Sequence, residues 1–284
     1  MGKKLGAASL SMGVNVILLL SKIVVAFMTG SIALFAESAH SFFDLLASIF
    51  AYLGIRKAEE PSDHTHHFGH EKFENLSSLL QTLLIVGTAF VILFEAYQKF
   101  ETPSPVESSE LGIVLMLISI PVTVMTSKYL HKIAHEEGGS SALEADSAHF
   151  VTDTVSSVSV LIGLILVKFG YGFGDPLSAV FVGVIMLYIS YELGVKSFRV
   201  FMDFSPDKET MGKIQFVLEK EKRITRFHKL RARISGSRIL VDVHIHVPHA
   251  TNVKLAHSIA HDLETRIIRK VPSVKEVSIH IEPD

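Results

Sequence analysis

The chain has 284 residues, of which 48% are hydrophobic, with a mean hydropathy of +0.38 and a formal net charge of −2. It contains no cysteine, which excludes disulfides, iron–sulfur clusters, thiolate zinc sites and cysteine nucleophiles, so any metal site must use His, Asp or Glu. Residues 1–204 carry 12 Lys/Arg and 19 Asp/Glu, whereas residues 205–284 carry 15 and 10. This change in charge near Phe204 predicts two domains, 1–204 and 205–284.

Long apolar stretches fill most of residues 1–204. A helix needs about 20 mostly apolar residues to cross the hydrocarbon core of a bilayer. Six spans are predicted, at residues 6–28, 32–55, 76–97, 111–130, 141–167 and 176–195. No small-residue cleavage site follows the first stretch, so we interpret it as a membrane helix and not as a signal peptide. The first domain is therefore predicted to be an α-helical membrane domain with six transmembrane helices.

Basic residues are distributed unevenly among the connections between these spans. One set of connections carries nine Lys or Arg near the span ends, from Lys3 to Arg199. The opposite set carries only Lys99 and Lys168 in those positions. Cytoplasmic loops hold the excess of Lys and Arg in membrane proteins, so we expect both termini to lie in the cytosol.

Residues 205–284 show the patterns of a small soluble domain. We expect helices at 211–222 and 252–270 and strands at 227–234, 238–247 and 274–281. In the second of these strands, Val241, Val243 and Ile245 alternate with Asp242 and His244, which is typical of a strand with one buried face. The α-β-β-α-β order favours a compact cytosolic α+β domain.

Two of the predicted spans share one ionisable motif, acid-Ser-Ala-His-x-x-x-Asp. It places His40 and Asp44 in the second span and His149 and Asp153 in the fifth. A His and an Asp four residues apart lie on one helix face, about 6 Å apart along the axis. Ionisable side chains at membrane depth are costly and face a partner or a cavity. Two facing helices would supply two imidazoles and two carboxylates, a tetrahedral set that suits Zn²⁺.

A structural interpretation of the same motif is that these residues pair with one another as a buried network. A single His-x-x-x-Asp would be weak evidence, but its repetition on separate spans favours a metal site. The acids that begin the motif, Glu37 and Asp146, either stand at the outer mouth of the site or lie near the membrane edge.

Two polar residues lie in the first span. We interpret Lys22 and Asn15 as structural, with Asn15 forming hydrogen bonds to another helix.

The connection between the second and third spans is rich in histidine. Four histidines and one aspartate within eight residues can wrap a metal ion, and the alternative is a solvated loop with weak metal affinity. These residues are Asp63, His64, His66, His67 and His70. We interpret His131 and His135, after the fourth span, as solvated loop residues.

Seven of the 15 histidines fall within residues 205–284. Any one of them alone is typical of a protein surface, but their grouping on shared strand and helix faces favours metal binding. The grouped residues are His228 on the first strand, His244 with His246, His257 with His261, and His280 with Glu282.

Together these motifs resemble those of the cation diffusion facilitators, over nearly the whole chain. The resemblance is carried by Gly30-Ser31, His40-x-x-x-Asp44, the loop from Pro61 to Lys72, the segment from Ala145 to Asp153, and six spans followed by a small domain. It implies a homodimer that exports zinc or a related ion from the cytosol in exchange for protons. It also implies that the cytosolic domain is ferredoxin-like, as in metallochaperones.

The resemblance further implies roles for individual residues. It assigns a transport site to His40, Asp44, His149 and Asp153, a loop site to Asp63, His66 and His70, and a binuclear cytosolic site to His228, His244, His257, His280 and Glu282. It implies a charge interlock between Lys72 and Asp203 near the dimer interface. Some members carry Asp where this chain has His40, and those look less selective among zinc, cadmium and iron, so His40 favours zinc. In this family an Asp is familiar at the position that Glu282 occupies in this chain.

We therefore predict a Zn²⁺/H⁺ antiporter and not an enzyme, with Zn²⁺ as substrate and regulator and H⁺ as counter-ion. We expect a multi-pass protein of the cytoplasmic membrane of a prokaryote, whose partners are membrane lipid, divalent metal ions and a second copy of the chain, and no nucleic acid. Three alternatives stay open: a related exporter of Fe²⁺, Mn²⁺, Co²⁺ or Cd²⁺, a membrane metal sensor or store without flux, and an intramembrane metallohydrolase. Ligand type alone does not fix the metal.

Overall fold

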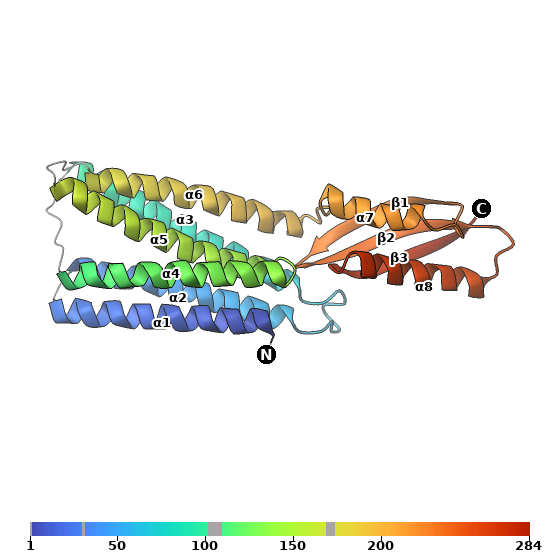
Figure 1. The fold of residues 1–284 in the computed structure, drawn as a ribbon, viewed down its shortest axis with the longest axis horizontal. Helices are drawn as coiled ribbons and strands as arrows, with labels where there is room; N and C mark the ends of the chain where they lie inside the picture. The colour runs from blue at the N-terminus through green and yellow to red at the C-terminus, as the bar shows by residue number, and fades with distance from the viewer. Residues whose placement is uncertain (1, 30–31, 102–109, 169–173) are drawn as a thin grey trace. The chain divides into compact units, whose positions relative to one another are not determined.

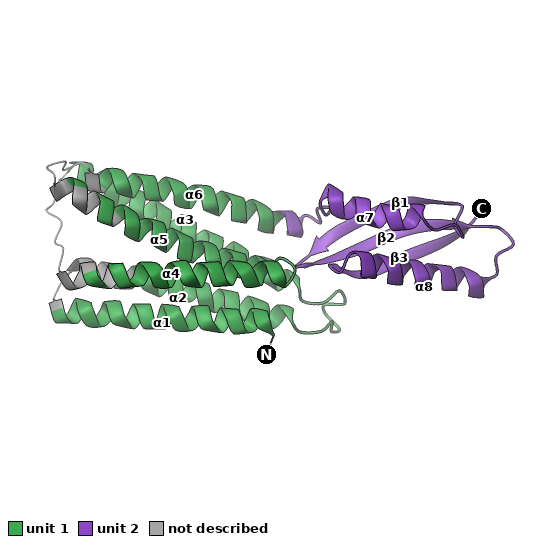
Figure 2. Cartoon of the chain, in the orientation of Figure 1, with its two compact units in different colours: residues 1–198 green, residues 199–284 purple. Residues whose placement is uncertain are grey.

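The computed structural model describes residues 2–29, 32–101, 110–168 and 174–284. Gly30 and Ser31 lie outside this part, and so does the side chain of Glu37. The chain forms two compact units, Met1–Phe198 and Arg199–Asp284, drawn in green and purple in Figure 2. Each unit has its own buried core.

Long helices build the first unit (Figure 1). Within the described residues there are six: α1 Lys3–Thr29, α2 Ile32–Ala58, α3 Lys72–Glu101, α4 Glu110–Glu136, α5 Ser141–Lys168 and α6 Gly174–Phe201. Each predicted span falls inside one of them. By length and composition, the described stretches Lys3–Met28, Lys72–Glu101 and Pro176–Phe201 are apolar enough to cross a membrane. Helices α2 and α5 contain the His and Asp residues of the repeated motif, which lower their hydropathy.

Helix α4 continues beyond its predicted span. His131 and His135 lie on its last turns, both exposed, with ring centroids 4.8 Å apart. The prediction that they are loop residues was therefore wrong, because polar residues prolong the helix after its apolar stretch. The helix ends at Glu136 and is followed by Gly138 and Gly139, whose φ angles are 85° and 86°, a left-handed conformation that glycine adopts without strain.

Small side chains allow the helices of the first unit to approach closely. At Gly54 of α2 an added Cβ would lie 2.4 Å from the Cβ of Ser77 on α3, so the contact requires glycine. Across the same contact the Ser77 hydroxyl donates to the carbonyl of Phe50 at 2.6 Å. Small residues are typical of helix contacts in membranes. One buried cluster joins α1, α2, α4 and α5, and a second joins Ile85 and Ala89 of α3 to Val182 and Met186 of α6.

The second unit is an α+β fold. Its elements are α7 Lys208–Glu219, β1 Arg226–Ser235, β2 Arg238–Val247, α8 Val253–Lys270 and β3 Val274–Pro283. The described strands form one sheet in the order β1-β2-β3, with β1 antiparallel to β2 and β2 parallel to β3. Helix α8 makes the crossover that a parallel pair needs. The predicted α-β-β-α-β order is confirmed.

The two helices of this unit cover one face of its sheet. Val243 and Ile245 of β2 are buried and belong to the same core as Leu263 of α8. Successive residues of a strand point to opposite faces. His244 and His246 therefore lie on the sheet face that the helices leave uncovered.

A buried acid ties the end of α7 to α8. Glu221, 7% exposed, accepts hydrogen bonds from Arg223 Nε at 2.9 Å and from Arg266 Nη1 at 2.5 Å. Arg223 also donates to Asp262 of α8 at 2.8 Å. The hydrogen bonds from Arg223, with the nearby charge of Arg266, lower the pKa of Glu221 to about 2. The ionised carboxylate therefore contributes to the stability of the folded unit.

Candidate metal sites

Helices α2 and α5 bring the two copies of the repeated motif together. His40, Asp44 and Asp153 offer ligand atoms that all lie within 4.8 Å of one another. His40 Nε2 is 3.8 Å from Asp44 Oδ1 and 3.8 Å from Asp153 Oδ1. His149 Nδ1 is 3.7 Å from Asp44 Oδ1. Three residues of the predicted transport site thus form one group, and His149 lies beside it at Asp44, outside the group whose atoms are all within 4.8 Å of one another. We call these four residues the α2–α5 cluster.

The spacing within the α2–α5 cluster suits a metal ion better than a set of mutual hydrogen bonds. N–H···O hydrogen bonds span about 2.7–3.2 Å, and the three contacts above are longer. In a tetrahedral zinc site with bonds of about 2.0–2.1 Å, neighbouring ligand atoms lie roughly 3.3 Å apart. His149 is 2% exposed, and neither ring nitrogen has a hydrogen-bond partner among the described residues. Buried polar groups normally have such a partner, and a cation at this place would supply it.

A small polar cavity of about 40 Å³ adjoins the cluster. His40, Asp44 and Asp153 line it, together with hydroxyl groups of α2, α4 and α5. Lys22 of α1 also lines it and donates to Ser41 at 2.6 Å. One water needs about 10–15 Å³ of such space, so the cavity has room for a few waters beside the ionisable ligands.

A chain of hydrogen bonds lies beside the α2–α5 cluster. Asn15 Nδ2 of α1 donates to the backbone carbonyl of Asp44 at 3.2 Å and to Ser48 Oγ at 2.7 Å, which confirms that Asn15 bonds across helices. Ser48 donates in turn to Asp146 Oδ1 at 2.9 Å. Asp146 is fully buried, and the two positions predicted for it, at a mouth of the site and near the membrane edge, stay predictions. Its side chain lies on the face of α5 that packs against α2.

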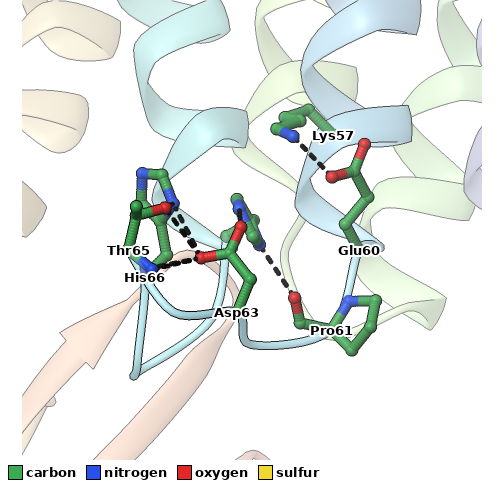
Figure 3. A network of polar contacts seen from close by, with 7 residues as sticks. Lys57, Glu60, Pro61, Asp63, Thr65 and His66 are labelled. Carbon is green, nitrogen blue, oxygen red and sulfur yellow. Dashed lines mark hydrogen bonds and ion pairs between the residues drawn. The ribbon is translucent and has the colours of Figure 1, made fainter.

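The loop between α2 and α3 folds around the carboxylate of Asp63 (Figure 3). The Asp63 Oδ1 atom accepts hydrogen bonds from the hydroxyl of Thr65 at 2.8 Å and from the backbone N–H of His66 at 2.6 Å. These bonds and one from the N–H of Thr65 hold the pKa of Asp63 well below its usual range. The carboxylate is therefore ionised, as a metal ligand must be.

Two histidines complete this loop group. His66 Nδ1 is 3.3 Å from Asp63 Oδ1, and His70 Nε2 is 3.3 Å from Asp63 Oδ2. His70 is buried, and its Nδ1 lies 3.1 Å from the carbonyl oxygen of Pro61, a contact that orients the ring. The three residues of the predicted loop site offer atoms within 4.8 Å of one another. His64 and His67 are exposed and are not part of this group.

The uncovered face of the sheet in the second unit carries a row of histidines. The strand register pairs His228 with His244, His244 with His280, and His246 with Glu282. Residues opposite one another on adjacent strands share a face and lie close together. Three strands therefore bring together side chains that are far apart in the sequence.

Glu282 divides these histidines into two groups. Its Oε1 atom is 2.7 Å from His244 Nδ1 and 3.7 Å from His280 Nε2, and its Oε2 atom is 3.0 Å from His246 Nε2 and 3.7 Å from His228 Nε2. Each group offers three ligand atoms within 4.8 Å of one another. A hydrogen bond from His244 lowers the pKa of Glu282, and desolvation lowers the pKa of His228. Both shifts favour the deprotonated forms that bind metal. We call these five residues the Glu282 cluster.

Comparison with known proteins places this arrangement in a family. A family model described as the cation efflux transmembrane domain matches residues 8–202, and one described as the cation efflux protein cytoplasmic domain matches residues 206–284. The chain belongs to the cation efflux family. It is 31% identical over 277 residues to the cation-efflux pump FieF of Shewanella oneidensis, covering 98% of this chain and 93% of that protein.

Other proteins also resemble the chain or a part of it. The cation-efflux pump FieF of Serratia proteamaculans is 30% identical over 268 residues, covering 94% of this chain and 88% of that protein. The metal-bound C-terminal domain of the CzcD transporter from Thermotoga maritima is 25% identical, with a TM-score of 0.26, over 26% of this chain and 87% of that domain.

Membership confirms the resemblance to the cation diffusion facilitators. This cation efflux protein is an integral membrane transporter of divalent metal cations, with a helical transmembrane domain followed by a small cytosolic domain that carries a three-stranded sheet. Its family consists of transporters and not of enzymes.

The residue assignments of all three sites in this cation efflux protein stay predictions, and so does the interlock of Lys72 with Asp203. His257 is exposed on α8 and belongs to neither group of the Glu282 cluster within one chain. Lys72 begins α3, whereas Asp203 belongs to the second unit, where its carboxylate accepts a hydrogen bond from Arg233 at 3.3 Å. The predicted cytosolic site omitted His246, although its alternation with valine on β2 already placed it beside His244.

Proposed function

We propose that this protein is a Zn²⁺/H⁺ antiporter that exports zinc from the cytosol by alternating access, as a homodimer. The α2–α5 cluster carries the proposal, because it joins two imidazoles and two carboxylates from two helices at contacts of 3.7–3.8 Å. Four ligands of this kind suit tetrahedral Zn²⁺. They come from an integral membrane domain, where such groups mark ion pathways.

Charge balance supports a divalent substrate. Moving an isolated ion into a low-dielectric interior is costly unless nearby groups neutralise it. The carboxylates of Asp44 and Asp153 together balance the two positive charges of Zn²⁺. His40 and His149 then complete the coordination without adding charge, which favours zinc over the harder cations that prefer oxygen ligands.

Competition between metal and protons supports the exchange. Imidazole and carboxylate ligands must be deprotonated to bind metal, so binding releases protons and protonation releases metal. An unperturbed histidine titrates at a pKa of about 6.5, close to the pH of the cytosol. When zinc leaves, protons on these ligands can offset the negative charge of the two carboxylates. The cavity beside the cluster has room for the water that such an exchange needs.

The loop group and the Glu282 cluster are proposed as regulatory zinc sites. Both lie outside the membrane helices and combine carboxylate and imidazole atoms within 4.8 Å of one another. A ligand shifts a conformational equilibrium only by its difference in affinity between two states. We therefore propose that zinc at these sites favours the transporting state of the dimer, and that Lys72 and Asp203 couple the two units.

The proposed topology has both termini in the cytosol, within the inner membrane of a bacterium. The distribution of Lys and Arg among the connections supports this orientation. The similar cation-efflux pumps come from bacteria, which supports the membrane.

Flux measurements in vesicles test the proposal. Purified protein is reconstituted into liposomes with a zinc indicator and a pH indicator, and Zn²⁺, Cd²⁺, Fe²⁺, Mn²⁺ and Co²⁺ are offered in turn under an imposed pH gradient. We expect zinc to move fastest, protons to move in the opposite direction, and His149→Ala to stop or uncouple both signals. Zinc movement without an opposing proton signal would leave a simple facilitator. Preference for another ion would move the assignment to that metal.

A further inference from the structure

Asp146 is a buried acid that the proposed zinc coordination does not use. Its side chain is 0% exposed, and Oδ1 accepts a hydrogen bond from Ser48 at 2.9 Å. The other oxygen, Oδ2, has no hydrogen-bond partner in the described part of the chain. An ionised buried carboxylate is normally stabilised by two or three backbone N–H donors or by a cation. Asp146 has neither: its carboxyl group bonds the hydroxyls of Ser48 and Ser11, and Oδ2 is left without a partner, which suits a neutral acid whose proton is on Oδ2.

No cation pairs with Asp146 in the described residues. None of their Lys, Arg or His nitrogens lies within 4.0 Å of its carboxyl oxygens. Basic groups of the helices packed against α5 contact other residues or are exposed. Lys4 of α1 bonds Glu74 of α3, Lys22 of α1 bonds Ser41, Lys196 of α6 pairs with Glu144 of α5, and Arg56 of α2 and Lys128, His131 and Lys132 of α4 are exposed. A buried charge without a partner is costly, so the acid is protonated when no metal is nearby.

Position and hydrogen bonds couple Asp146 to the α2–α5 cluster. It precedes His149 by three residues, which is about 4.5 Å along the helix axis. Ser48, which bonds its carboxyl group, also accepts a hydrogen bond from Asn15, and Asn15 donates to the backbone carbonyl of Asp44. Charges in such a buried region are weakly screened by solvent and salt.

Charge at the cluster determines whether Asp146 can ionise. The ionisable groups of the neighbouring cluster are His40 and Asp44 on α2, and His149 and Asp153 on α5, and the charge of Asp153 acts on Asp146. Without metal, the negative carboxylates of Asp44 and Asp153 oppose a third negative charge. A bound divalent cation cancels that negative charge and attracts an ionised Asp146.

We propose that Asp146 is a second proton-binding residue of the transport cycle, which holds a proton when the α2–α5 cluster carries no metal and releases it when a divalent cation binds there. The O–H bond of Asp146 breaks, the proton passes to water, and a proton returns when the cation leaves. This inference rests on the proposed function, because it takes the α2–α5 cluster as the metal site.

Counting protons tests the proposal. The full-length protein carries Asp63→Ala and Glu282→Ala, which confine zinc to the α2–α5 cluster, and is titrated with ZnCl₂ in lipid nanodiscs. Calorimetry in buffers of different ionisation enthalpy gives the protons released per zinc ion. We expect Asp146→Asn to release about one proton fewer than this background protein, with zinc still bound by the four intact ligands. Equal proton release from both proteins would overturn the proposal.

Ser48→Ala is the matched control. It removes a hydrogen bond from the same chain but keeps the acid, so its proton count should equal that of the background protein. If Ser48→Ala lowers the number of protons released per zinc ion as much as Asp146→Asn does, the loss is an effect of packing and the proposal is rejected.

Should Asp146→Asn not fold, infrared difference spectra of the background protein replace it. Zinc should then remove the carbonyl band of a protonated carboxyl group, and Ser48→Ala should shift that band. A band that zinc or Ser48→Ala leaves unchanged contradicts the assignment.

The proposed function fails in a different way. If the α2–α5 cluster is not the metal site, the background protein binds no zinc, or binds it equally well with Asp153→Ala added. If only the role of Asp146 is wrong, zinc binding depends on Asp153 and the proton count is independent of Asp146.

Discussion

In the α2–α5 cluster the ligand atoms lie 3.7–3.8 Å apart, whereas in the Glu282 cluster Glu282 lies 2.7 Å from His244 and 3.0 Å from His246. The surroundings differ as well. Asp44 and His149 are 5% and 2% exposed, whereas the His280 side chain in the sheet is 63% exposed. Glu282 is thus within hydrogen-bond distance of two histidines of the sheet, whereas neither ring nitrogen of His149 in the membrane domain has a hydrogen-bond partner among the described residues.

This difference supports the two roles proposed for the clusters. A partly exposed cluster on a rigid sheet is stable without metal, so its occupancy follows the zinc concentration and suits regulation. A buried cluster between two helices needs either metal or protons to balance its carboxylates. That requirement suits exchange of one for the other. Changes at the two clusters should therefore have different consequences for transport.

The largest effect is expected at the α2–α5 cluster. Asp153→Ala removes one of two carboxylates that balance the charge of the ion, so zinc flux should fall by at least about 100-fold. The change leaves the helix contacts in place, so the protein should remain a folded dimer by size-exclusion chromatography. Flux into proteoliposomes measures the loss. Glu192→Ala, which removes an exposed acid from α6, is the control and should transport normally. Near-normal flux in Asp153→Ala would show that this cluster is not part of the transport pathway.

At the Glu282 cluster we expect lost affinity with flux retained at high zinc. Glu282 contacts all four histidines, so Glu282→Ala should weaken zinc binding to residues 199–284 by about 10–100-fold. Binding should also weaken as the pH falls, because protons compete with zinc for the imidazole nitrogens. Calorimetry on this fragment measures both effects, and sedimentation tests whether it dimerises. His249→Ala, which removes an exposed histidine outside the cluster, should bind like the parent. No zinc binding by the parent fragment would contradict the regulatory role.

Selectivity should change when one imidazole of the membrane cluster is replaced. His40→Asp keeps a ligand at this position but makes the set harder and more negative, which relaxes its preference for zinc. We expect the ratio of cadmium to zinc flux to rise about tenfold while zinc transport continues. Parallel flux measurements with the two ions give this ratio. An unchanged ratio would argue that His40 does not touch the transported ion.

The smallest effect is expected in the stability of the second unit, away from both clusters. In the folded state the pKa of Glu221 is lowered from 4.5 to about 2. Its ionised carboxylate therefore contributes fully to the free energy of unfolding above pH 4.5, and this contribution is lost as the pH falls toward 2. Glu221→Gln should lower the free energy of unfolding by about 1–2 kcal/mol at neutral pH, since the arginines are partly exposed. The difference from the parent should vanish near pH 2. Urea unfolding of residues 199–284 at several pH values measures it, and a difference independent of pH would contradict the assignment.

Much of this arrangement could be predicted from the sequence, because apolar runs and the repeated motif are local patterns. His40 and Asp44 share a helix turn by their spacing alone, and alternation on β2 placed His244 opposite the core. The burial of Asp146 was not predictable, since the sequence does not show which face of α5 packs against Ser48. The extension of α4 past residue 130 was also missed, because polar residues at the end of a membrane helix carry no apolar signal.

The spectrum of bound zinc tests the central assignment most directly. A full-length variant with Asp63→Ala and Glu282→Ala retains only the α2–α5 cluster, and X-ray absorption at the zinc edge reports its ligands. We expect about one zinc ion per chain, with four nitrogen or oxygen neighbours at roughly 2.0–2.1 Å and the outer-shell scattering of two imidazole rings, lost on addition of Asp153→Ala. A protein that retains no zinc, or a shell of six oxygens that Asp153→Ala leaves unchanged, would contradict the account.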